Sequence, residues 1–167
     1  MNGEAKGNIV KMPVALIDIL TAHQLKEAIL LALLKQQTTG KGSYVSVSLM
    51  ETAIASLANQ ATNWLMGGHI PQRMGTAHPN IAPYGDIFQT SDEKLLVLAV
   101  GNDKQFARMC ETLEQNKLAT DKRFANNSLR VKNRVILQAI LAPIFANYQR
   151  DKVLKLLTEK GVPAAAI

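Results

Sequence analysis

The chain has 167 residues, of which 47% are hydrophobic and 19% are charged, with a formal net charge of +6. This balance excludes an intrinsically disordered protein, and the length allows one domain with its own core. The longest strictly apolar run, residues 28–34, is far shorter than a membrane span, and the start MNGEAKGN lacks the apolar core of a signal peptide. We therefore expect a cytoplasmic protein with no membrane partner.

The positive charge is spread along the chain. Its densest stretch, residues 117–134, contains one aromatic residue, Phe124, and so lacks the series of stacking side chains that single-stranded nucleic acids require. We therefore expect no nucleic-acid partner. The pattern favours a solvated basic face, which would suit an anionic small molecule.

The first part of the chain predicts two long helices. Residues 1–12 are polar and contain glycine, which indicates a disordered tail, and 13–68 form the expected helical segment. Residues 19–37 lack glycine and proline and are rich in helix-favouring side chains. Their second half, AILLALL, is apolar all round, so it should be buried on several sides or lie in a subunit interface.

The connection to the second helix carries a sequence that resembles a phosphate loop. The run TTGKGS, residues 38–43, lacks the first glycine of that motif and precedes an expected strand at 44–48 rather than a helix, which indicates a plain turn. The second helix, 49–66, should be capped by Ser48 with Glu51 in a capping box, and should end at the glycine pair that follows.

The remainder predicts a linker loop, 69–83, and then a small α+β domain, 84–167. Three prolines in the linker argue against a helix or a central strand there. Strands are expected at 84–90 and 95–100. A helix should follow, capped by Asn102 or Asp103, because apolar side chains recur at helical spacing in the set Phe106, Met109, Cys110 and Leu113.

Two further helices are expected at 131–148, with a kink at Pro143, and at 151–160. The predicted fold class is therefore α+β and mainly helical: two long helices, followed by a small domain with a short β-sheet and three helices.

Metal chemistry is not expected. His23, His69 and His78 lack the spacing of metal ligands, and the single cysteine, Cys110, excludes a cysteine-cluster site.

Asp18 stands where an apolar segment passes into a helix, and it has two interpretations. It could be a plain helix cap, or a carboxylate held at the positive end of the helix and able to attack an acyl carbon. The two interpretations are compatible. The proline-rich loop 73–84, RMGTAHPNIAPY, could be no more than a stiffened linker.

Three runs together carry a resemblance to a known family: NQATNWLMGGHIPQRMGTAHPNIAPYGDIF, LAVGNDKQFARMCETL and DKRFANNSLRVKNR. They resemble the class III CoA-transferases, a family that includes formyl-CoA transferase, carnitine CoA-transferase and α-methylacyl-CoA racemase. The resemblance covers residues 13–167. Family enzymes are more than twice as long, so the chain is similar to their central segment, truncated relative to the family fold.

The resemblance implies a role for each candidate site residue. Asp18 would be the catalytic aspartate that takes the acyl group from acyl-CoA, and Gly75 and His78 would lie in a loop over the substrate. Coenzyme A or acyl-CoA would be a substrate, with no tightly bound cofactor, and the residues that bind it stay unknown because the family's nucleotide-binding half lies upstream of the matching aspartate.

The family's interlaced dimers imply a homo-oligomer, most simply a dimer. The alternative is a non-catalytic remnant of the family that oligomerises or binds a partner through its apolar helix.

Overall fold

The computed structural model describes residues 1–167 and divides them into two compact units, Met1–Arg73 and Met74–Ile167. The division falls inside the segment 69–83. Eight helices and one three-stranded sheet confirm the expected α+β, mainly helical class. No helix has the length and apolar character needed to cross a membrane.

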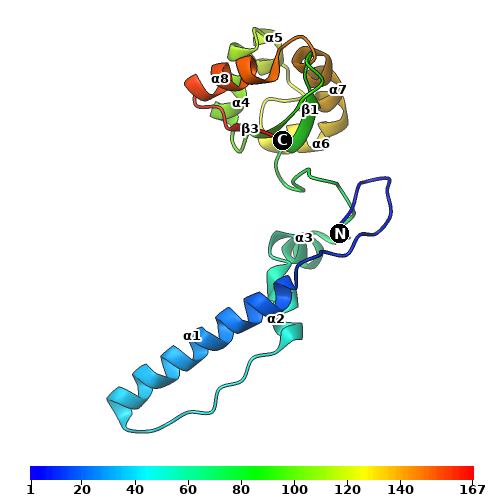
Figure 1. Cartoon of the computed structure of the whole chain (residues 1–167). Coiled ribbons are helices and arrows are strands. Elements are labelled where there is room, and N and C mark those ends of the chain that lie inside the picture. Colours follow the sequence, from blue (N-terminus) through cyan, green and yellow to red (C-terminus); the bar gives the residue numbers. More distant parts are fainter. The chain divides into compact units, whose positions relative to one another are not determined.

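Three helices form the first unit: α1 (Leu16–Thr39), α2 (Leu49–Ser56) and α3 (Asn59–Gly67) (Figure 1). The first predicted helix is confirmed and begins three residues earlier than expected. It packs against α2, where the Thr52 hydroxyl donates to Oε1 of Gln24 at 2.8 Å. Ser48 caps α2 as predicted, because its Oγ accepts the backbone N–H of Glu51 at 3.4 Å.

The prediction of one continuous helix over 49–66 is wrong, because the helix is interrupted between α2 and α3. Ser56 donates its hydroxyl to the carbonyl of Ala53, and the N–H groups of Leu57 and Ala58 each bond three residues back instead of four. Ala58 then takes φ +48°. A side chain that bonds the local backbone and a tightened last turn end a helix without any glycine or proline.

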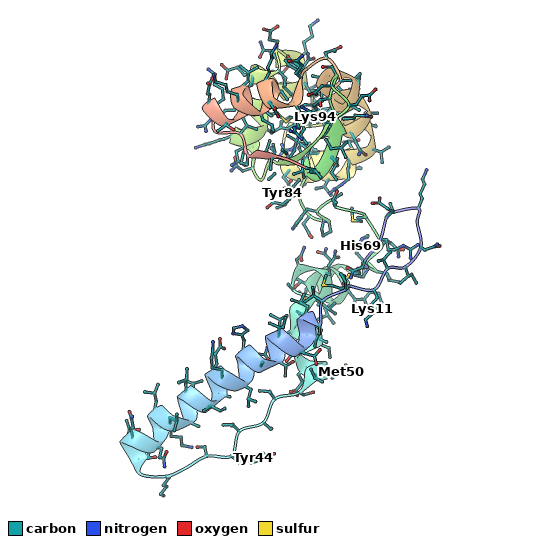
Figure 2. The ribbon with its side chains drawn as sticks, in the orientation of Figure 1. Lys11, Tyr44, Met50, His69, Tyr84 and Lys94 are labelled. Atoms are coloured by element: carbon teal, nitrogen blue, oxygen red, sulfur yellow. The ribbon has the colours of Figure 1, made fainter.

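The predicted strand at 44–48 is also wrong. This segment is extended, but it runs from the far end of α1 back to α2 with no strand paired to it (Figure 1). Tyr44, labelled on this segment in Figure 2, is 92% exposed. The alternating side chains suit a strand, but a strand also needs a partner for its backbone groups.

The first unit has no hydrophobic core. Its single buried residue is Thr52, and α1 contains no buried residue at all. The five large side chains of the AILLALL run are 44–67% exposed: Ile29, Leu30, Leu31, Leu33 and Leu34. The burial that this run predicts is therefore not provided within the chain.

The second unit is built on an antiparallel sheet in the order β1 (Tyr84–Gln89), β2 (Leu95–Ala99), β3 (Ala164–Ala166). The first two strands confirm the predicted ones to within one residue. The third was not predicted, because three alanines carry little strand preference. It forms by pairing with the central strand, with Leu98 opposite Ala164.

Five helices accompany the sheet: α4 (Asp103–Thr112), α5 (Asn116–Ala119), α6 (Asn127–Lys132), α7 (Arg134–Phe145) and α8 (Arg150–Glu159). Helices α4, α7 and α8 confirm the three predicted ones, while α5 and α6 are additional short turns. The predicted start of a helix at Val131 is wrong, because Asn133 separates α6 from α7. Asn102 caps α4, since its Oδ1 accepts the N–H of Gln105 at 2.9 Å.

One hydrophobic core lies between the sheet and the helices of this unit. The rings of Phe88 on β1 and Phe145 on α7 stack at 4.8 Å. All four predicted core residues of α4 are buried: Phe106, Met109, Cys110 and Leu113. Burial raises the pKa of the Cys110 thiol to about 12, so this cysteine is a packing residue and not a nucleophile.

Candidate functional site

Asp18 lies in the first turn of α1 and is exposed. The N-cap position belongs to Ala15, and no side chain caps the helix. The plain-cap interpretation of Asp18 is therefore wrong. The carboxylate sits instead two residues inside the helix start, where the positive end of the helix dipole interacts favourably with a negative charge. An exposed carboxylate there is open to a substrate.

The loop that carries Gly75 and His78 belongs to the second unit and folds back onto the start of β1. The Thr76 hydroxyl donates to the carbonyl of Gly85 at 2.5 Å, and the N–H of His78 donates to the carbonyl of Tyr84 at 2.8 Å. Gly75 has φ +61°, a conformation that favours glycine. The loop therefore has a defined path along the strand, which begins at the Tyr84 labelled in Figure 2.

The His78 ring is held by its neighbours. It packs against the ring of Tyr84 in a T-shaped arrangement, with ring centroids 5.4 Å apart, and Nδ1 accepts the N–H of Asn80 at 3.1 Å. An accepting Nδ1 leaves the proton of the neutral ring on Nε2. Burial, and secondly the positive charge of Arg134, lower the pKa of His78 from its ordinary value, so the ring is neutral at pH 7.

Two arginines beside this loop are exceptions to the solvated basic face that the charge pattern favours. Arg130 is fully buried, and it forms an ion pair with Asp103 at 2.6 Å, from Nη2 to Oδ1. Arg134 is half-buried, and its charge acts on Asp86, which is 4% exposed. Burial is the larger effect on Asp86 and raises the pKa of that carboxyl. Composition alone gave no signal that these arginines point inward.

The structure brings Gly75 and His78 together in one loop of the second unit, and it places Asp18 in the first unit. No group of three or more metal-ligating side chains is present. The first unit also holds an open, apolar pocket of about 360 Å³ whose lining has no charged side chain. Such a lining does not suit phosphate groups. It includes Ile54, Leu57, Ala61, Trp64 and Leu65.

Comparisons with known proteins cover the whole chain. Residues 1–167 match the model of CoA-transferase family III. The chain is 37% identical, over all its 167 residues, to a succinate–glutarate CoA-transferase of Agrobacterium fabrum, of which it covers 41%. It is 35% identical over the same length to a human succinyl-CoA:glutarate CoA-transferase, of which it covers 38%.

A solved structure also matches the whole chain and extends well beyond it. A CAIB/BAIF family protein from Brucella suis is 42% identical and superposes with a TM-score of 0.70, over 100% of this chain and 44% of that one. The chain therefore spans about two fifths of the length of the proteins that it matches.

Proposed function

Since the chain belongs to CoA-transferase family III, whose model matches residues 1–167, we propose that it contributes the acyl-accepting carboxylate, Asp18, to a CoA-transfer reaction. Membership confirms the resemblance identified from the three sequence runs. The observation that carries the proposal is the exposed carboxylate of Asp18 at the start of α1, in a chain that matches the family over its full length.

The proposed chemistry needs only carboxylates and a thiol. An oxygen of Asp18 attacks the thioester carbonyl of an acyl-CoA, the C–S bond breaks, and the CoA thiolate leaves behind a mixed anhydride. The thiolate then attacks the Asp18 carbonyl, which releases the first acid and leaves CoA on Asp18 as a thioester. A second acid repeats both steps in reverse order, so that it leaves as the new acyl-CoA and Asp18 is regenerated.

The proposed substrates are short dicarboxylic acids. Two relatives more than 30% identical to the chain are named for transfer between succinate or succinyl-CoA and glutarate. The net charge of +6 suits these anionic acids and the anionic CoA ester. We therefore take succinyl-CoA as the donor and glutarate as the acceptor.

Substituting the nucleophile tests this proposal. Asp18→Asn is expected to lower the rate of glutaryl-CoA formation from succinyl-CoA and glutarate by roughly 1,000-fold or more, because an amide cannot form the anhydride. The product is measured by liquid chromatography and mass spectrometry. Hydroxylamine should also attack the activated Asp18 carbonyl of the CoA thioester, release CoA, and leave a hydroxamate of Asp18 itself on the peptide that contains it.

Glu51→Gln is the matched control, since Glu51 is an exposed acidic residue in the first turn of another helix of the same unit. It should leave the rate unchanged. Equal rates for Asp18→Asn and the unmodified protein would contradict the proposal. So would the absence of both glutaryl-CoA formation and calorimetric CoA binding.

A second candidate function is self-association through α1, and the exposed AILLALL run favours it. A large exposed apolar surface marks an interaction site. We propose a homodimer in which this run is covered, whether or not the chain is catalytic.

The double substitution Leu31→Glu and Leu34→Glu is expected to convert the dimer into a monomer, because it places charges on side chains that are 67% and 59% exposed. Sedimentation velocity measures the mass. Lys35→Glu, on an exposed polar position of the same helix, should leave the dimer intact. A monomeric unmodified protein at the same concentration would overturn this candidate.

A further inference from the structure

Three polar side chains form a stripe along α6 and the start of α7. Asn127 and Arg130 lie three residues apart on one face of α6, and Arg134, four residues further on, is the first residue of α7. All three are at least partly buried. This stripe is not used by the chemistry proposed for Asp18.

Every member of the stripe bonds to the backbone of the loop that carries His78. The Nδ2 of Asn127 donates to the carbonyl oxygen of Asn80 at 2.7 Å. The Nε of Arg130 donates to the carbonyl oxygen of Ala82 at 2.8 Å. The Nη2 of Arg134 donates to the carbonyl oxygen of Ile81 at 3.0 Å and to that of His78 in a shorter bond. The Oδ1 of Asn127 also accepts the N–H of Ala82 at 3.2 Å.

The stripe is itself fixed in the second unit. The guanidinium of Arg130 lies 4.6 Å above the ring of Phe106 and donates to the carbonyl of Phe124 at 3.2 Å, besides its ion pair with Asp103. A buried guanidinium with all these partners has little freedom to move, and hydrogen bonds from charged groups are the stronger ones. The loop is therefore attached to a rigid base.

We propose that Asn127, Arg130 and Arg134 form a clamp that fixes residues 78–82 to the second unit, and that Arg134 is a positioning residue for His78. The clamp bonds the backbone carbonyl groups of the loop, so these bonds do not depend on the identity of most of the loop's side chains. Its effect on CoA transfer rests on the proposed function, whereas its effect on loop order does not.

Hydrogen exchange, measured by NMR on the full chain, tests the clamp. Arg134→Met keeps an unbranched, flexible stem and removes the donors. It is expected to speed exchange at the amides of His78 and Asn80 by about tenfold or more, because these amides do not bond Arg134 and respond only to opening of the loop. The amides of Leu96 and Leu98 in β2 should keep their rates.

Two further variants isolate the effect. Lys132→Met removes a charge from an exposed position of α6 and should change none of these rates. Asn127→Ala removes a second part of the clamp and should speed exchange at the His78 amide, whose own hydrogen bond is to the carbonyl of Tyr84. Unchanged exchange at His78 in both Arg134→Met and Asn127→Ala would overturn the clamp.

The titration of His78 tests independently whether Arg134 lies beside the ring. Arg134→Met should raise the pKa of His78 toward 6.5, because it removes a nearby positive charge and exposes the ring to water. Lys132→Met should leave it unchanged. A pKa that does not move in Arg134→Met would show that Arg134 does not lie against the His78 loop, and the clamp would lose this member.

Transfer activity completes the test. Because the family resemblance implies that the His78 loop lies over the substrate, Arg134→Met should lower the rate of CoA transfer. Arg134→Lys should restore part of it by providing one cation that can reach a loop carbonyl. Failure of the unmodified protein to transfer CoA would contradict the proposed function, and the exchange and titration results would still decide the clamp. Unimpaired transfer by a variant whose loop exchanges rapidly would refute the positioning role.

Discussion

Replacing Gly85 by alanine is expected to destabilise the second unit by about 2–4 kcal/mol, because two costs coincide at this residue. Gly85 has φ +78°, which alone costs an alanine about 1–2 kcal/mol. A Cβ would also lie 1.9 Å from the carbonyl oxygen of Thr76, a distance that no flexible side chain can relieve. The loop must then leave the strand, and the bond from Thr76 to Gly85 is lost.

Urea unfolding followed by circular dichroism measures this loss. Gly101→Ala is the matched control, since Gly101 follows β2, has no left-handed backbone angle, and would place its Cβ 3.5 Å from the flexible end of Gln105. It should change the free energy of unfolding by less than about 1 kcal/mol. If both alanine variants unfold at the same urea concentration, the close approach of Thr76 to Gly85 is not a feature of the folded protein.

The elements that could be predicted from the sequence are those determined by local patterns. The helix α4 has a capping residue, Asn102, and four apolar side chains at helical spacing, and the structure confirms both. The strand β3 and the break at Ala58 have no such local signal. The first depends on pairing with a strand far away in the sequence, and the second on hydrogen bonds that the pattern does not specify.

The candidate site likewise combines features that local sequence patterns indicate with contacts that only the folded chain creates. Asp18 stands at a helix start that the sequence indicates, but its chemical role comes from family resemblance. The spacing of Asn127, Arg130 and Arg134 was present in the sequence, yet an arginine is usually exposed, and only the fold shows these side chains turned toward a loop about 50 residues away in the sequence.

The distribution of buried residues predicts that the two units differ in their ability to fold alone. The whole hydrophobic core lies in residues 74–167. We expect this fragment to unfold in one cooperative transition, with a free energy of unfolding of at least about 3 kcal/mol. Residues 1–73 bury only Thr52, so this fragment should show no cooperative transition.

A pair of leucines provides the control. Leu98→Ala in the isolated fragment 74–167 should cost about 2–5 kcal/mol, because Leu98 is completely buried. Leu31→Ala in the full chain should cost less than about 0.5 kcal/mol when the transition of the second unit is followed, because Leu31 is 67% exposed and lies in the other unit. A cooperative transition in fragment 1–73 at micromolar concentration, with no change of mass, would show that the first unit has a source of stability other than apolar burial. Its apolar helix would then not need a partner, and the case for a dimer through α1 would fail with it.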